Sequence, residues 1–185
     1  MSLKKINYYQ PNDFYALSRF QSDFLKHLQK KCKKNQPLVL ICIGSDRATG
    51  DCLGPLVDQS LMDFPVYSVY GTLQFPVHAK NLDKTMELIY KFHKNPFIIA
   101  IDSCLGYEDH VGYITLSSMP LCPGRGVSKH LPPIGDISIT GIVDRFSESS
   151  HETIQTTRLQ TVFYLASFIA KGIQIPKFQV SYPPL

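Results

Sequence analysis

The sequence predicts an α/β fold in which helices cover both faces of a mostly parallel β-sheet. Two segments, 37–44 (PLVLICIG) and 96–106 (PFIIAIDSCLG), are almost continuously apolar and end in glycine, which is typical of strands buried on both faces. Segments with the apolar spacing of helices lie between the predicted strands. Strands that alternate with helices of about ten residues indicate crossover units, and such units place parallel strands in one sheet.

Each element follows from a local pattern. Apolar residues at spacings of three and four predict helices, and short apolar or alternating runs bounded by turn residues predict strands. In chain order, the sequence predicts a helix over 11–34 that starts near Asp13, a strand at 37–44, a helix over 56–64, a strand at 66–72, a helix over 82–92, strands at 96–106, 111–118 and 137–143, and a helix over 152–171. The stretch 119–136 holds four prolines and three glycines, too many for a regular element, and long loops of this kind are uncommon unless they are functional.

The composition is that of one globular domain. A chain of 185 residues with 44% apolar residues can bury a core without disulfides or a structural metal. Its five cysteines are scattered and contain no CxxC pair, which argues against a zinc cluster or a disulfide framework and favours the reducing cytoplasm. We find no signal-peptide pattern and no apolar run long enough to span a bilayer, so we expect no membrane association.

The positive charge does not indicate a nucleic-acid partner. Part of the net charge of +4 comes from four lysines at the end of the first predicted helix, namely Lys30, Lys31, Lys33 and Lys34. Cations at a helix C-terminus interact favourably with the helix dipole, and no aromatic residues alternate with these lysines. We therefore interpret the cluster as a solvated helix end.

Two acidic residues stand where a site is expected in such a sheet. Asp51 lies between the first predicted strand and its helix, and Asp102 ends the apolar run FIIAID. Ligands of open α/β sheets bind at the carboxyl ends of the strands, so both carboxylates are candidates for one catalytic site. Each also has a simpler interpretation, because aspartate often caps a helix start, as Asp51 would, or a turn, as Asp102 would before Ser103.

The loop 44–55 (GSDRATGDCLGP) is not a phosphate-binding motif, because it matches neither GxxxxGK[ST] nor GxGxxG. Anion binding at the helix start after Gly50 is left as a minor alternative. We take Arg47, Gly50 and Gly54 of this loop, together with His78 in PVHAKN, as candidate substrate-binding residues. For Arg47, a surface salt bridge is an equal explanation.

Two carboxylates that meet across a cleft have two main chemical uses. They share a proton and activate water, or they bind a divalent metal. A third ligand favours the metal, and His130 in the long loop before the last strand is the best candidate, although a loop histidine beside a lysine is more often a surface residue. Cys52 and Cys104 follow the two acids closely, and the nearby carboxylates disfavour their thiolates, so we expect no nucleophilic role for them.

Four long blocks of the sequence, CIGSDRATGDCLGPLV, YGTLQFPVHAKNL, FIIAIDSCLG and LPPIGDISITGIV, closely resemble the YyaC family of sporulation proteins, described as spore proteases. This family is in turn similar to the germination protease of spores and to the hydrogenase maturation endopeptidases. The resemblance implies a three-layer α/β/α sandwich on a five-stranded mixed sheet. It covers a protease-like α/β region over 37–173, with 1–36 as an N-terminal helical extension and 174–185 as an extended tail of one domain.

The resemblance also implies roles for the candidate residues. In the maturation endopeptidases two acids and a later histidine bind the nickel of the substrate, and Asp51, Asp102 and His130 match them in order, with His130 the loosest match. In the germination protease two aspartates carry peptide hydrolysis, which again points to Asp51 and Asp102. Cys52, directly after the first acid, departs from the expected pattern of short residues.

These inferences give two hypotheses for function. The first is a peptidase of sporulation or germination, acting in the cytoplasm of the sporulating cell or forespore, that hydrolyses a spore protein such as a small acid-soluble spore protein through Asp51 and Asp102. It requires no cofactor other than an optional divalent metal. The alternative is a non-catalytic sporulation factor that uses the same cleft to bind a peptide or protein partner. The sequence does not predict an oligomeric state.

Overall fold

The protein folds around a six-stranded mixed sheet with helices on both faces. The computed structural model describes residues 6–61, 66–123 and 131–174. All five predicted strands are present, as β2 (Leu38–Cys42), β3 (Ser68–Tyr70), β4 (Phe97–Gly106), β5 (Ile114–Ser117) and β6 (Ile137–Arg145). The strand order is β1-β5-β6-β4-β2-β3, and β5 is antiparallel to both of its neighbours while β6, β4, β2 and β3 are parallel. The predicted α/β class with a mixed sheet is therefore confirmed.

The sheet has one strand more than the five that were predicted. The additional strand, β1 (Ile6–Tyr9), pairs with β5 from Ile6 opposite Ser117 to Tyr9 opposite Ile114. Its four residues are too few to show a clear alternation, and only Tyr9 is buried, so local sequence gives a weak strand signal. The segment 1–36, predicted as a helical extension, thus contributes both a strand and a helix to the described fold.

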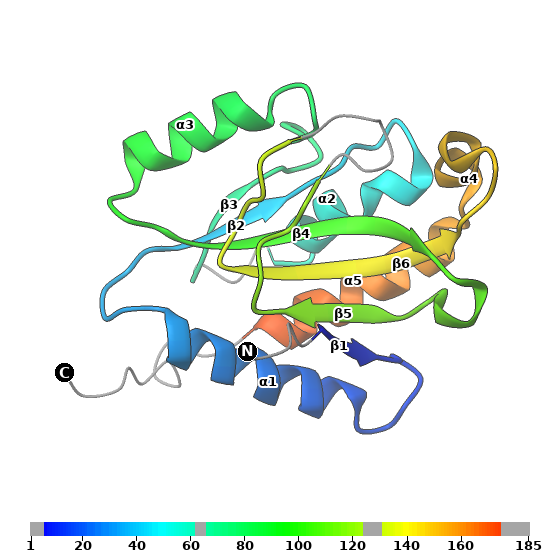
Figure 1. The fold of residues 1–185 in the computed structure, drawn as a ribbon, viewed down its shortest axis with the longest axis horizontal. Coiled ribbons are helices and arrows are strands. Elements are labelled where there is room, and N and C mark those ends of the chain that lie inside the picture. The colour runs from blue at the N-terminus through cyan, green and yellow to red at the C-terminus, as the bar shows by residue number, and fades with distance from the viewer. Residues whose placement is uncertain (1–5, 62–65, 124–130, 175–185) are drawn as a thin grey trace.

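The helices form the outer two layers of an α/β/α sandwich (Figure 1). They are α1 (Ala16–Lys31), α2 (Leu53–Gln59), α3 (Leu82–Phe92), α4 (Ser150–Thr156) and α5 (Leu159–Ile173), with short 3₁₀ helices η1 (Thr49–Cys52) and η2 (Glu108–His110). The last predicted helix, 152–171, is in fact two helices, because the backbone is extended at Thr157 and Arg158. No helix of the described ranges is long and apolar enough to cross a membrane.

Two apolar clusters hold the layers together. One packs α1, α2 and α5 against one face of the sheet, and the other packs α3 and residues 121 and 134 against the opposite face. Strand β4 serves both, since Ile99 and Ile101 point into the first cluster and Ile98 and Ala100 into the second. This double burial explains why the strand is apolar without alternation.

The strands end at different heights, and this difference creates the region of interest. Strand β2 pairs with β4 only from Leu38 to Cys42, opposite Phe97 to Ile101. Strand β4 continues to Gly106 beside β6, and Asp102 is its first residue beyond the paired part of β2. Figure 1 shows β4 and β6 running together towards the end of the sheet near α4.

Candidate functional site

Asp51 lies in η1, directly after the loop that leaves β2. The backbone N–H of Ser45 donates to the carbonyl oxygen of Asp51 at 3.1 Å and to its carboxylate Oδ2 at 3.0 Å, and the Ser45 hydroxyl lies 3.4 Å from the same Oδ2. The carboxylate does not cap α2, which starts at Leu53 without a side-chain cap. Its hydrogen bonds hold it against the end of β2 instead.

Gly44 makes this arrangement possible. Its φ is +130°, a region that residues with a side chain rarely adopt, and a Cβ atom placed there would lie 1.8 Å from the carbonyl oxygen of Asp51. The backbones at Gly44 and Asp51 therefore approach more closely than any other residue at position 44 would allow. Gly44 also donates to the Val77 carbonyl at 2.7 Å, which joins this turn to the loop before α3.

Asp102 projects from β4 on the α3 side of the sheet, the same side as Ala100. The N–H of Ser103 donates to its Oδ1 at 2.8 Å, as expected from the turn-capping interpretation, but here within a continuous strand. Its cross-strand neighbour on β6 is Thr140. The residue as a whole is partly exposed.

The two carboxyl groups interact electrostatically. Burial raises the pKa of Asp102 well above its ordinary value, the negative charge of Asp51 raises it further, and the Ser103 N–H opposes both effects. Burial also raises the pKa of Asp51, whereas the two hydrogen bonds from Ser45 and the charge of His78 lower it. The structure thus places the two acids that the sequence selected close enough to interact electrostatically, and the pKa of Asp102 is the more strongly raised of the two.

Three polar residues that were not selected from the sequence, Thr140, Thr115 and Cys104, lie on the same face of the sheet as Asp102. Thr140 hydrogen-bonds to Thr115 at 2.6 Å between their hydroxyl oxygens, and it also contacts the Cys104 thiol. Burial raises the pKa of Cys104 to about 11, with Thr140 lowering it and Asp102 raising it. The thiol is therefore not ionised at neutral pH, as expected from the sequence. Only alternation along β4, β5 and β6 could have indicated that these side chains share a face.

His78 is the histidine that the described residues place beside Asp51. A parallel bridge between Ile43 and Val77 brings its loop to the end of β2, and its own N–H donates to Asn81 Oδ1 at 2.8 Å. The ring nitrogen Nδ1 is buried and has no hydrogen-bond partner among the described residues. An unpaired nitrogen in this position can donate to, or accept from, a bound group.

The metal hypothesis depends on a residue that lies outside the described residues, His130. Within the ranges that the structure describes, no group of three or more His, Cys, Asp or Glu side chains is arranged to hold a metal ion. Asp51 and Asp102 offer two oxygen ligands, which suit a hard divalent cation but do not complete a site by themselves. Metal binding therefore stays a prediction.

The three loop residues predicted to bind substrate have different surroundings. Arg47 is exposed at the tip of the loop. Gly50 is buried where α4 crosses η1, since a Cβ atom there would lie 2.7 Å from the carbonyl oxygen of Ile154, and Gly54 lies against Ile43, at 2.3 Å by the same measure. The close backbone contacts give both glycines a structural reason, and their role in binding stays a prediction.

Comparison with known proteins places the chain in a family. Residues 5–172 match the family described as "Protein of unknown function (DUF1256)". The chain belongs to this family. This DUF1256 chain is also 42% identical over 170 residues to the "Uncharacterized protein YyaC" of Bacillus subtilis (strain 168), an alignment that covers 91% of this chain and 82% of the relative. The resemblance predicted from the four sequence blocks is confirmed.

Among solved structures, the DUF1256 chain is similar to the crystal structure of a [NiFe] hydrogenase maturation protease, HycI, from Thermococcus kodakarensis KOD1. The TM-score is 0.46 with 18% sequence identity, and the match covers 80% of this chain and 99% of the other.

Proposed function

We propose that this protein is a peptidase that hydrolyses peptide bonds with the carboxyl groups of Asp51 and Asp102. The observation that carries the proposal is the coupling of these two groups. Both are partly buried beyond the end of β2, both have a raised pKa, and the charge of one raises the pKa of the other. When the charge of one carboxylate raises the pKa of another, one group can stay ionised as a base while the other keeps its proton as an acid.

The surroundings assign the two roles. Asp51 accepts two hydrogen bonds from Ser45 on Oδ2, which stabilise its ionised form, and its Oδ1 accepts none from the described residues. Asp102 receives only the Ser103 N–H on Oδ1 and is the more strongly perturbed group. Asp51 is therefore the general base and Asp102 the general acid.

Hydrolysis then proceeds in two steps, the formation and the collapse of a diol, and each step moves two protons. Asp51 takes a proton from a water molecule while the water oxygen bonds to the peptide carbonyl carbon, and Asp102 gives its proton to the carbonyl oxygen. The resulting diol collapses when Asp51 returns its proton to the amide nitrogen, the C–N bond breaks, and Asp102 recovers a proton from one hydroxyl. We propose that His78, whose charge acts on Asp51, helps to position that carboxylate.

For the biological setting we propose a role in sporulation or germination, in the cytoplasm of the sporulating cell or forespore. The substrate would be a spore protein, with small acid-soluble spore proteins as the first to test. The support for this setting is the similarity to the YyaC family that the sequence blocks indicate. Arg47, Gly50 and Gly54 would line the approach of the peptide. In a metal-dependent version of the reaction, Asp51, Asp102 and His130 would hold a divalent metal that polarises the peptide carbonyl, and Asp102 would then be an ionised ligand instead of the general acid.

The test is to incubate the purified protein with a small acid-soluble spore protein, with and without added Mg²⁺, Mn²⁺, Zn²⁺ or Ni²⁺, and to follow cleavage by mass spectrometry. D51N and D102N should each abolish cleavage. The matched control is D58N, because Asp58 is also a partly buried carboxyl with a raised pKa, but its pKa is raised by burial alone. Cleavage by the double variant D51N/D102N would refute the carboxylate mechanism. If the spore protein binds tightly but is not cleaved under any of these metal conditions, the chain is a binding module instead of a peptidase.

A further inference from the structure

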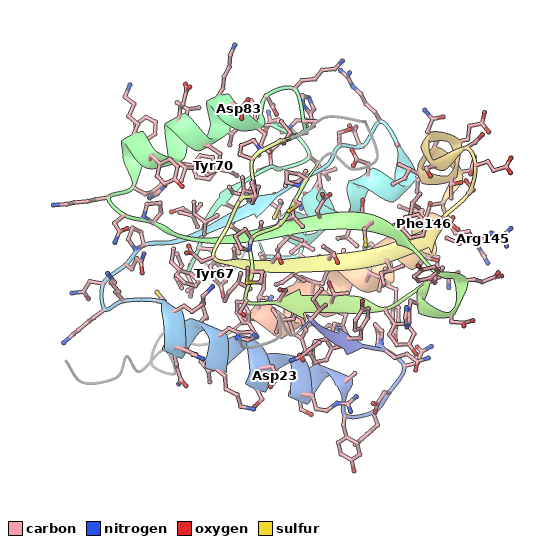
Figure 2. The ribbon with its side chains drawn as sticks, viewed as in Figure 1. Asp23, Tyr67, Tyr70, Asp83, Arg145 and Phe146 are labelled. Carbon is pink, nitrogen blue, oxygen red and sulfur yellow. The ribbon has the colours of Figure 1, made fainter. Side chains whose placement is uncertain are left out.

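A pocket lies where β4 and β6 end, and it is separate from the carboxyl pair. Its volume is about 410 Å³, and its walls come from two segments far apart in the sequence, namely Gly106, Tyr107 and Glu108 after β4, and Arg145, Phe146 and Ser147 after β6. The Phe146 N–H donates to the Gly106 carbonyl at 2.8 Å and joins the two segments. Figure 2 shows Arg145 and Phe146 at this end of the sheet.

The walls of the pocket combine aromatic rings with a cation. The rings of Tyr107 and Phe146 meet edge to face with centroids 6.0 Å apart, yet Tyr107 is 76% exposed and Phe146 60% exposed. Arg145 reaches Glu108 at 3.4 Å, a solvent-exposed ion pair that contributes little to stability. Large exposed rings beside an arginine are typical of surfaces that bind another group, because a third ring can pack on their faces and under the guanidinium.

Strand β4 connects this pocket to the carboxyl pair. Gly106 follows Asp102 by four residues, which corresponds to about 13 Å along a strand. From Asp102 to Gly106, β4 pairs with β6 on one side only among the described residues, because its pairing with β2 on the other side stops at Ile101. The side chains of Ser103, Cys104 and Leu105 are partly exposed along this stretch.

The backbone of this stretch favours an extended peptide as the ligand. The carbonyl of Ile101 accepts from Ile43 on the β2 side, so by alternation the backbone groups of Ser103 and Leu105 face that side too, beyond the last residue of β2 that pairs there. Because the Ser103 N–H already donates to Asp102 Oδ1, the groups offered to a ligand are the Ser103 carbonyl and the N–H and carbonyl of Leu105. A peptide that continues the line of β2 would bond to them as an added strand. It would then pass from Asp102 towards Tyr107 and Phe146.

We propose that the pocket binds an aromatic side chain of an extended peptide substrate, about four residues from the bond that is cleaved. The inference rests on the proposed function for the position of that bond, and it adds the class of residue that the enzyme selects. Tyr107, Phe146 and Arg145 are specificity-determining residues and do not touch the reacting atoms.

Cleavage-site profiling tests this assignment. The protein is incubated with a mixture of synthetic peptides of known sequence, and the residues around each cut are identified by mass spectrometry. Aromatic residues should be enriched about tenfold near the fourth position on one side of the cut. F146A should lose this enrichment and raise the KM of the aromatic peptides about tenfold, with kcat on other peptides unchanged. The control F92A removes a ring that is 68% exposed at the end of α3 and does not line the pocket, and it should keep the wild-type profile.

The outcomes separate this inference from the proposed function. Cleavage without positional enrichment, or with the same enrichment in F146A, would overturn the pocket assignment and leave the peptidase proposal intact. If no peptide is cut, the same peptides are immobilised, and the amounts of wild type, F146A and F92A that each peptide retains are compared. Weaker retention of F146A alone on aromatic peptides would support the pocket, and equal retention of all three proteins would overturn it.

Discussion

Replacing Gly44 with alanine tests whether the close approach of two backbones positions Asp51. At Gly44, φ is +130° and an added Cβ would lie 1.8 Å from the Asp51 carbonyl oxygen. The backbone fixes the position of the Cβ, and its neighbour is a backbone oxygen, so no side-chain rotation relieves the contact. Gly112 supplies a matched control, because its φ is +86° and an added Cβ there meets nothing within 4 Å.

The expected magnitude is the sum of two costs. An unfavourable backbone conformation costs about 1–3 kcal/mol at either glycine. The contact with Asp51 adds about 1–3 kcal/mol at Gly44 alone, as for other overpacked sites. G44A should therefore lose about 2–6 kcal/mol of unfolding free energy, and G112A about 1–3 kcal/mol. For a chain of this size each kcal/mol corresponds to about 2–4 °C in Tm.

Urea denaturation of the wild type, G44A and G112A gives the three free energies of unfolding. A second measurement, carboxyl-carbon NMR, follows the pKa of Asp102, which should fall in G44A when the negative charge of Asp51 moves away. Equal destabilisation by both substitutions, with an unchanged Asp102 pKa in G44A, would show that the approach of Gly44 to Asp51 does not position the carboxylate.

Three further predictions concern stability and ionisation. The folded protein holds the Asp102 proton more tightly than the unfolded chain does, so the contribution of Asp102 to wild-type stability should fall as the pH rises above about 4. D102N lacks this loss and should gain stability relative to the wild type over the same range. Parallel denaturation curves at several pH values check this, and a difference that does not vary with pH contradicts it. S45A removes the hydroxyl that lies 3.4 Å from Asp51 Oδ2, so the pKa of Asp51 should rise further. The free energy of unfolding should fall by only about 0.5 kcal/mol. An NMR titration that shows a lower pKa of Asp51 in S45A would be incompatible with this hydrogen bond. F24A should lower the free energy of unfolding by about 3–5 kcal/mol in calorimetry, because the ring is fully buried against the sheet. F92A should change it by no more than about 0.5 kcal/mol. A small loss for F24A would mean that α1 is dispensable for the core.

The parts of the fold that were predictable are those with strong local patterns. Strands β2 and β4 are buried on both faces, so their apolar runs are nearly unbroken, and the end of each run located an acid of the candidate pair. The break between α4 and α5 had no such signal, because it contains neither proline nor glycine. It is stabilised by tertiary contacts instead, with the buried hydroxyl of Thr157 at 3.1 Å from Asp144 Oδ2 and 2.8 Å from the Thr153 carbonyl.

The surroundings of the site were less predictable for the same reason. Ser45 and Thr140 are ordinary polar residues in the sequence, and they become partners of Asp51 and Cys104 only when a turn and a strand register bring them there. The pocket after β4 requires Tyr107 and Phe146 to meet across two loops. A single sequence supplies no pattern that links positions so far apart.

The double hydrogen bond between Ser45 and Asp51 closes the loop between them into a ring whose ends are fixed to the sheet. Asp46 and Arg47, at the tip of that ring, are exposed to solvent. Changes in length or charge at the tip need not be transmitted to the carboxylate, since the ring is closed below them. The loop thus divides into an anchored base that holds Asp51 and an exposed tip, where a substitution of Asp46 or Arg47 should leave the position of the carboxylate unchanged.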